Sequence, residues 1–433
     1  MRQILDLHLH SRYSRACSPQ LTLENIARAC RTKGVDIIAT GDFTHPAWFE
    51  SIEKELIETA PNSGLYKLKT AADNQIKFIL STELALIYKD GDRCRRIHLV
   101  IHAPNIAAVK ELNKQLGKKY NIHSDGRPIL GISAPELVKL ILKIDSRFLI
   151  YPAHIWTPWF SVFGSKSGFN SLEECFKDQT KYIYAYETGL SSDPEMNWRL
   201  SALDKLTMLS NSDAHSLGNI AREANVMEIA GPVTYQAIYD IIKGQRRIPA
   251  ANHNTNITAR KSGLEMTIEF YPEEGMYHIN GHRACNFSCE PNESRKLKNI
   301  CPVCKKPLVI GVLNRVEELA DRPAGFRPKN AVDFKKLVEL DKIIAEALNI
   351  KSRNSIAVQK QYRQLINDFG NELFILLDLD LPRIGKEIDF RIVDGIKRVR
   401  AGELNIKPGF DGQYGEINIF SEASHPGKQN PLL

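Results

Sequence analysis

The chain has 433 residues, 43% of them hydrophobic and 25% charged, which is the composition of an ordinary folded protein with the length for about two to four domains. This excludes a disordered, collagen-like or coiled-coil chain. No apolar run approaches the roughly 20 residues that a membrane span needs, and the first ten residues place polar side chains where a signal peptide has its apolar core. We therefore expect a cytoplasmic protein with no membrane partner.

Charged residues and cysteines are unevenly distributed along the chain. There are 58 Lys and Arg residues against 51 Asp and Glu, a net charge of +7, and the basic residues concentrate in the last third. This distribution favours an anionic partner such as nucleic acid in that part of the chain. Of the eight cysteines, four lie between residues 285 and 304, which favours metal binding over a disulfide framework. We interpret the other four as buried thiols: Cys17, Cys30, Cys94 and Cys175.

The first 250 residues alternate short apolar segments with amphipathic ones, the pattern of a parallel sheet or barrel. The predicted strands are 4–10, 35–40, 76–83, 97–102, 148–154, 182–187 and 207–212. The predicted helices are 22–33, 107–120, 134–144 and 235–243. Thr22 is a plausible cap for the first helix, and Gly34 follows its end.

Beyond residue 250 the pattern changes. Residues 252–262 are polar and unpatterned, which predicts a linker. We expect a β-hairpin from 264–271 and 276–279, then helices at 334–348 and 358–369, and a frayed tail at 424–433. The predicted domains are therefore 1–252, 263–322 with the hairpin and the cysteine cluster, and 323–433, a helical C-terminal domain.

Potential metal ligands gather at the ends of the predicted strands. In the first strand Asp6, His8 and His10 share one face, because side chains alternate along a strand. The other candidates follow or end later strands: Asp42, His45, Glu83, His98, His102, His154, Asp213 and His215. The C-terminal ends of such strands meet at one rim, so we predict a polynuclear metal site there.

Nitrogen and oxygen donors without thiolates suit Zn, Mn or Fe, and a carboxylate such as Glu83 can bridge two ions. Paired metals commonly cleave phosphate esters by generating hydroxide near neutral pH. We therefore predict phosphoester hydrolysis, with Asp213, Glu83 and His10 as the catalytic residues and two or three divalent ions (Zn, Mn, Mg or Fe) as cofactors.

Several short segments resemble the motifs of PHP-domain phosphoesterases: DLHLHSRYS, ATGDFTHP, HLVIHAP, PAH and SDAH. The resemblance implies a distorted (β/α)7 barrel with up to three metals on its rim. One ion would be held by His8, His10, Glu83 and Asp213, a second by Glu83, His98 and His154, and a third would use His215. Phe43 stands where the family has a histidine, and the further ligand of the first motif has no clear counterpart near Cys17 or Ser18. Asp42 or His45 would fill that gap.

The cysteine cluster has the spacing of a structural zinc site. Two pairs, Cys285 with Cys289 and Cys301 with Cys304, would provide four thiolates in tetrahedral geometry. We interpret His278 and His282, just upstream, as structural or DNA-facing. Basic residues surround the cluster, and further ones precede a glycine-rich segment with Phe410 and Tyr414; both regions are candidates for contacting a phosphate backbone.

The order of these features, a PHP-type barrel, then EFYPEEGMYHINGH, the four cysteines, GVLNRVEELADRP and a helical end, resembles the endonuclease Q family over nearly the whole chain. The resemblance implies a DNA repair nuclease that nicks 5′ of uracil, hypoxanthine or abasic sites and leaves a 3′-hydroxyl and a 5′-phosphate. A sliding clamp is a possible further partner. The alternatives are a small-molecule phosphoesterase like histidinol-phosphate phosphatase and a DNA-binding PHP protein without catalysis.

Recognition of a deaminated base requires a donor for its new carbonyl group, and the nucleotide must leave the stack to reach the metals. The segment YETGLSSDP follows the sixth predicted strand and offers the hydroxyls of Ser191 and Ser192. We predict that this segment supplies the pocket, with Tyr13 or Arg95 as stacking or phosphate partners. The alternative is a simple turn capped by Ser and Asp.

Overall fold

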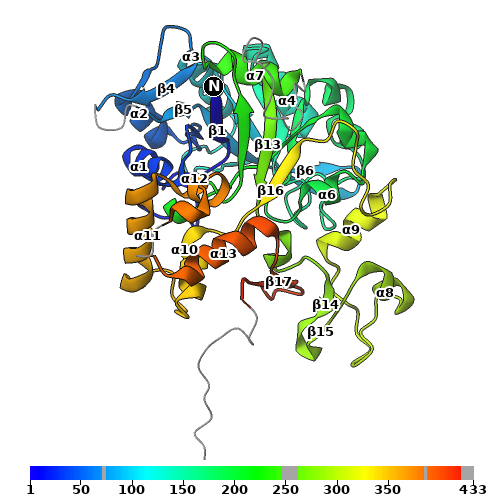
Figure 1. Ribbon diagram of the computed structural model, residues 1–433. Coiled ribbons are helices and arrows are strands. Elements are labelled where there is room, and N and C mark those ends of the chain that lie inside the picture. Colours follow the sequence, from blue (N-terminus) through cyan, green and yellow to red (C-terminus); the bar gives the residue numbers. More distant parts are fainter. Residues whose placement is uncertain (71–74, 245–261, 385–387, 421–433) are drawn as a thin grey trace, which may run out of the picture.

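The structure, a computed structural model, describes residues 1–70, 75–244, 262–384 and 388–420. Most of the predicted linker at 252–262 and all of the tail at 424–433 lie outside these residues. The chain has a mixed α/β fold (Figure 1). Among the described residues, no helix combines the length and the apolar composition that crossing a bilayer requires.

The largest sheet has eight strands in the order β16-β13-β12-β1-β2-β5-β4-β3. The strands of this sheet are β1 Arg2–Asp6, β2 Ile37–Ala39, β3 Leu56–Glu58, β4 Leu65–Leu68, β5 Lys77–Ile79, β12 Ala224–Glu228, β13 Gly263–Glu269 and β16 Asp333–Lys336. The first two strands run parallel, and β12 pairs antiparallel with β1. Leu5, Leu7 and Leu9 of the first predicted strand are fully buried, so this sheet lies in the core.

A second sheet has the order β8-β6-β7-β9, and β10 and β11 form a separate parallel pair. Their bounds are β6 Ser81–Asp90, β7 Arg93–His102, β8 Ile129–Leu130, β9 Leu149–Pro152, β10 Ala185–Glu187 and β11 Thr207–Leu209. A parallel bridge between Leu9 and Ala214 connects the chain after β1 to the chain after β11. The end of β1 in the large sheet and the end of the β10–β11 pair therefore lie side by side, where the chain leaves the strands.

The helices of this part are α1 Leu23–Lys33, α2 Pro46–Glu55, α3 Ile106–Gly117, α4 Ala134–Ile144, α5 Leu172–Phe176, α6 Pro194–Asn197 and α7 Tyr235–Lys243. The predicted cap is confirmed, since the Thr22 side chain accepts a hydrogen bond from the Asn25 amide. Gly34 ends α1 with φ of 95°, a left-handed conformation that glycine adopts without strain.

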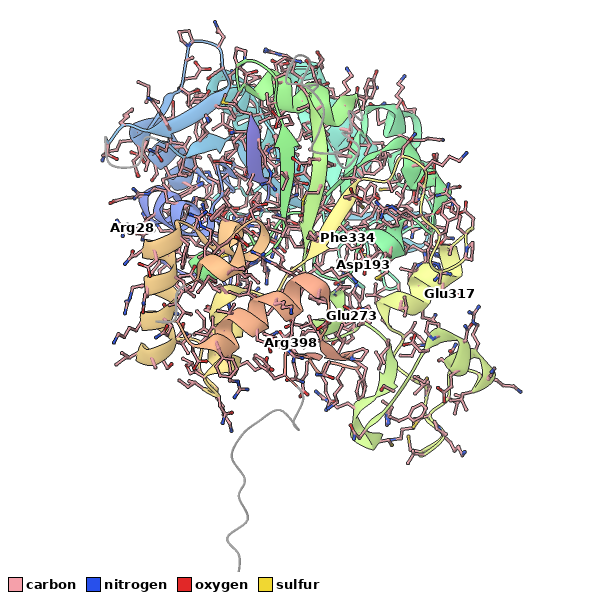
Figure 2. All side chains as sticks on the ribbon, viewed as in Figure 1. Arg28, Asp193, Glu273, Glu317, Phe334 and Arg398 are labelled. Carbon is pink, nitrogen blue, oxygen red and sulfur yellow. The ribbon has the colours of Figure 1, made fainter. Side chains whose placement is uncertain are left out.

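The cysteine cluster lies in a small module built from β14 Asn280–His282, β15 Phe287–Cys289 and α8 Pro291–Lys296, followed by α9 Val312–Leu319. In Figure 1 this module projects at the lower right, away from the sheets. Glu317 on α9, labelled in Figure 2, connects the module to the rest of the protein. Its carboxylate binds Arg295 at 3.1 Å and Arg199 at 2.5 Å.

A helical unit follows, below the sheets in Figure 1. It comprises α10 Leu340–Ala347, α11 Ile356–Phe369, α12 Glu372–Leu377 and α13 Phe390–Ala401, with a short ribbon of β17 Asn405–Lys407 and β18 Glu416–Asn418. Its fully buried residues include Ile343, Ile344, Val358 and Ile392. Arg400, a candidate for DNA contact, instead donates hydrogen bonds to the carbonyl oxygens of Ile375, Leu376 and Leu379, so it stabilises this unit.

Four predictions about this half of the fold and the thiols are wrong. The hairpin from 264–271 and 276–279 does not form, because β13 is hydrogen-bonded between β12 and β16. The predicted helix at 334–348 begins as β16, since residues 333–336 pair with the free edge of β13 before α10 starts. Cys94 is exposed at the start of β7. Phe410 is 6% exposed and packs on Gly281, so it offers no stacking surface.

Candidate metal centre

Four side chains from distant parts of the sequence converge where β1 ends. His8, His10, Glu83 and Asp213 each contribute one potential ligand atom, and these atoms lie within 4.8 Å of one another. His10 Nε2 is 3.1 Å from Asp213 Oδ1 and 3.3 Å from Glu83 Oε2. Three of the four side chains are buried, and Asp213 is partly exposed toward solvent.

A second group shares one residue with the first. Glu83 Oε1 lies 2.8 Å from His98 Nδ1 and 3.3 Å from His154 Nε2. The two imidazole nitrogens are 3.1 Å apart. Glu83 is thus placed between two clusters of nitrogen and oxygen donors, the position of a bridging carboxylate.

The donor atoms fit divalent metals. His8 Nε2, His10 Nε2, Glu83 Oε1 and Asp213 Oδ1 are buried, and none makes a well-aligned hydrogen bond with a described residue. A buried polar atom without a partner costs roughly 1–3 kcal/mol, so four of them at one point need a common partner. Mixed imidazole and carboxylate donors suit Zn, Mn or Fe.

In three of the ligand histidines, the ring nitrogen that faces away from the donor atoms contacts another side chain. Glu187 at the end of β10 lies 3.0 Å from His8 Nδ1, Asp42 Oδ1 lies 3.0 Å from His10 Nδ1, and the Thr157 hydroxyl lies 2.9 Å from His154 Nδ1. Partners of this kind fix the ring orientation and make the other nitrogen a better ligand. The imidazoles are therefore oriented before any ion arrives.

The electrostatics of the rim follow from burial and from close opposite charges. Burial acts to lower the pKa of His8, but Glu187, Asp213 and Glu83 together raise it well above its ordinary value. Burial acts to raise the pKa of Glu83, yet His98, Arg127 and His8 hold it well below its usual range. Positive charge is thus needed at this site to balance the carboxylates, and divalent cations supply it.

Two residues at the rim were missed by sequence reasoning. Glu187 ends a predicted strand as the other candidates do, so its position was a usable signal. Arg127 lies on a loop before β8 with no such signal, and its Nη1 donates to Glu83 Oε2 at 3.0 Å. Gly126 beside it packs so closely against Asp42 and Ser14 that a Cβ there would lie 2.3 Å from both side chains.

The residues expected for a third ion do not form a ligand group within the described parts of the chain. Asp42 is occupied by His10, the Ser11 amide and the Ser14 hydroxyl. His215 Nδ1 lies 2.8 Å from the Asp213 carbonyl oxygen, and His45 Nε2 lies 3.1 Å from the carbonyl oxygen of residue 123. His102 contacts the Tyr151 hydroxyl at 3.0 Å, behind the rim.

In the cysteine module, His282, Cys285, Cys301 and Cys304 offer ligand atoms within 4.8 Å of one another. His282 Nδ1 lies 3.6 Å from Cys304 Sγ, so it stands where we expected a fourth thiolate. Cys289 is buried on β15 opposite Asn280 and is outside this group. Three thiolates and one imidazole are also a regular structural zinc set. His278 is buried and outside the group as well.

The residues predicted to recognise a base are mostly engaged elsewhere. Ser192 is fully buried; its hydroxyl donates to the Thr188 carbonyl oxygen and accepts from the Asn197 side chain, so it has no donor for a substrate. Arg95 is 8% exposed, donates to the Gly168 carbonyl oxygen and lies over the Phe169 ring, so its guanidinium is engaged within the protein.

The remaining part of that segment is a turn. Ser191 is half-buried in it, and the Asp193 side chain caps α6 by accepting from the Met196 amide at 2.8 Å. Tyr13 stacks on His45 with ring centroids 4.4 Å apart, so one face of its ring is already covered.

Comparisons with known proteins find similar sequences over most of the chain. The family model "MJ0043 C-terminal domain" matches residues 339–403. Uncharacterized protein MJ0043 of Methanocaldococcus jannaschii is 31% identical over 61% of this chain, and uncharacterized protein YqxK of Bacillus subtilis is 27% identical over 92% of it. The match covers only 31% of the length of MJ0043 but 92% of YqxK.

Two solved structures are similar over nearly the whole fold. The lesion-specific endonuclease PfuEndoQ from Pyrococcus furiosus has a TM-score of 0.82 and 30% identity, covering 96% of this chain and 95% of PfuEndoQ. Endonuclease Q in complex with a 27-mer duplex carrying an abasic lesion has a TM-score of 0.81 and 29% identity, with both chains fully covered. The chain belongs to the endonuclease Q family.

Proposed function

We propose that the protein is a metal-dependent DNA repair endonuclease that hydrolyses the phosphodiester on the 5′ side of deaminated bases and abasic sites. The observation that carries this proposal is the placement of Glu83 between two donor groups, in a fold whose solved relative binds a duplex with an abasic lesion at its active site. The substrates follow from the family, and uracil and hypoxanthine are the deaminated bases we propose.

The residues present can hold two ions. His8, His10, Glu83 and Asp213 would hold one, and Glu83, His98 and His154 the other. Such a pair activates water near neutral pH and stabilises the attacking and leaving oxygens of an in-line displacement. The expected products are a 3′-hydroxyl and a 5′-phosphate. We further propose that the two sheets form the distorted (β/α)7 barrel of PHP proteins.

The chain's own side chains carry out the other parts of the reaction. Glu187, Asp42 and Thr157 orient the ligand imidazoles. Arg127 fixes one oxygen of Glu83, and its side chain remains 24% exposed, so its free nitrogens can face a phosphate. Asp213 is the most exposed carboxylate of the first donor group and faces the solvent from which substrate arrives.

The cysteine module would bind one structural zinc ion. Its ligands hold together a unit whose buried apolar cluster consists of Cys289, Cys301 and Leu308. Binding energy of this kind is folding energy. Basic side chains on the module, among them Arg283, Lys296 and Lys298, would contact the DNA backbone. A sliding clamp as a further partner remains a prediction.

A direct test uses labelled duplexes that carry a single uracil, hypoxanthine or abasic site, with Mn²⁺ or Mg²⁺. The proposal expects one nick 5′ of each lesion and none in the undamaged duplex, with the ends identified by ligation and phosphatase treatment. Hydrolysis of histidinol phosphate without any nicking would favour the small-molecule phosphatase, and binding without cleavage would favour a non-catalytic protein.

A further inference from the structure

One tryptophan is exposed beside the second donor group. Trp48, Trp156 and Trp198 are at most 8% exposed, whereas Trp159 is 49% exposed. A single exposed ring is ordinary by itself. Trp159, however, lies only five residues after His154, on the segment that leads away from the rim.

The backbone that carries this indole is fastened to both histidines of the second donor group, to the imidazole of His154 and to the main chain of His98. The Thr157 hydroxyl contacts His154 Nδ1 at 2.9 Å and donates to the Trp159 carbonyl oxygen at 2.8 Å. The Phe160 carbonyl oxygen accepts a hydrogen bond from the His98 amide at 2.9 Å. The main chain of Trp159 is therefore tied to the donor group before substrate binds.

The backbone bends sharply at the next residue. Phe160 has φ of 59°, a left-handed conformation that costs a bulky residue of order 1–3 kcal/mol and persists where the surroundings enforce it. The bend places the Phe160 ring 4.5 Å from the His98 ring and leaves the Trp159 ring outside.

A cation lies over one face of the exposed ring, so a base would stack on the opposite face. The Arg96 guanidinium carbon is 5.5 Å from the Trp159 ring centroid and 5.9 Å from that of Phe160. Arg96 precedes His98 by two residues on β7, so both side chains leave the same face of the strand. An aromatic face flanked by a guanidinium is the combination that binds a nucleobase and its phosphate.

We propose that Trp159 stacks on the base of the damaged nucleotide after it has left the duplex, and that Arg96 binds the backbone phosphate beside it. The proposal rests on the proposed function. A base lies one sugar away from its phosphate, so a phosphate bound at the rim would leave the base to be held by a side chain beside the rim, and we assign that part to Trp159. Stacking tolerates any base, so Trp159 would retain both uracil and hypoxanthine.

The first test measures tryptophan fluorescence of the zinc-loaded Asp213→Asn protein, which keeps the substrate intact. Trp159 is the exposed fluorophore, so a duplex with one uracil should quench the emission, and the same protein with Trp159→Phe should respond far less. A duplex with an abasic site should quench little, because no base is present to stack. Equal quenching by both duplexes would overturn the proposal, since the ring would then fill the gap in the helix.

The second test compares single-turnover cleavage rates. Trp159→Ala should lower uracil cleavage about tenfold more than abasic-site cleavage, and Trp159→Phe should restore most of the difference. Arg96→Ala should weaken binding of both duplexes, with Arg93→Ala at the exposed start of β7 as the matched control. Equal losses on both substrates with Trp159→Ala would contradict the proposal. Failure of the wild-type protein to nick either duplex would instead contradict the proposed function.

Discussion

The rim of the sheets and the cysteine module hold their donor atoms in different ways. At the rim the ligands are buried against a continuous apolar core, and Glu187, Asp42 and Thr157 orient three of the imidazoles from behind. The cysteine module has a buried cluster of three residues, two of them cysteines. We therefore expect metals at the rim to add chemistry to a core that folds without them, and we expect the module to depend on its metal to fold.

The largest effect should come from removing a ligand at the rim. Asp213→Asn should lower the single-turnover cleavage rate at least about 100-fold, the loss seen when a group that stabilises the transition state is removed. DNA affinity and the melting temperature should hardly change, because the carboxylate serves the metals within an intact core. Asp145→Asn, at a surface pair with Arg147, is the control for changing an aspartate.

Cleavage rates and fluorescence anisotropy of a labelled duplex separate the two parts of this prediction. A large loss of DNA binding in Asp213→Asn would show that the rim carries affinity as well as chemistry. A large drop in melting temperature would show that the rim, like the module, needs its ligands to fold.

The next largest effect should be structural and confined to the module. Cys301→Ser should release one zinc ion per chain and open residues 280–310 to proteolysis, because zinc binding is folding energy there. The sheets should keep their stability. Elemental analysis measures the zinc content, and limited proteolysis measures the opening of residues 280–310. A module that stays resistant to proteolysis after losing zinc would contradict the claim that it needs the metal to fold.

A paired substitution identifies the fourth zinc ligand. His282→Ala should also lose zinc, whereas Cys289→Ser should retain it, since His282 is within the donor group and Cys289 is outside it. The reverse result would restore the set of four thiolates that the sequence predicts.

A smaller effect is expected from replacing the residues that contact the second ring nitrogen of the ligand histidines. Glu187→Gln should weaken metal binding at the rim by about 10- to 100-fold, because the amide orients His8 less well and no longer raises its basicity. Excess Mn²⁺ should restore most of the cleavage rate. A rate that excess metal does not restore would give Glu187 a direct catalytic part.

The smallest effect concerns stability and pH. Glu269 is the last residue of β13, and Glu223 immediately precedes its partner strand β12; both side chains are fully buried. Burial and the neighbouring Glu269 carboxylate raise the pKa of Glu223 well above its ordinary value, and burial with the charge of Asp193 raises that of Glu269. Between the ordinary glutamate range and these raised values, the folded protein holds protons that the unfolded chain has lost.

The free energy of unfolding should therefore decrease as pH rises through that window, and Glu269→Gln should flatten the decrease. Urea denaturation at a series of pH values measures the slope. An unchanged slope in the variant would show that the pair does not account for it.

The sequence predicted the rim better than the second half of the fold. His8, His10, Glu83, His98, His154 and Asp213 could be selected because polar residues interrupt apolar strand segments, most of them near a predicted C-terminal end, which is a local signal. Arg127 could not, since it reaches Glu83 from a loop. The local spacing of apolar residues favours a helix over residues 333–336, but their pairing with β13 is a long-range contact that overrides this spacing and makes them strand β16.

The cysteine module also shows what local spacing cannot predict. The spacing of Cys285, Cys289, Cys301 and Cys304 indicates a metal site, but spacing does not say which side of β15 each sulfur faces. The pairing of β14 with β15 turns Cys289 inward and leaves His282 beside Cys304.

The central claim is that Glu83 joins two donor groups into one metal centre, and the metal content of a single variant tests it most directly. Elemental analysis of the purified wild-type protein should find about two ions at the rim besides the zinc of the module. Glu83→Gln should lose both rim ions together and keep the zinc, with its circular dichroism unchanged. Retention of either rim ion in that variant would contradict a shared centre.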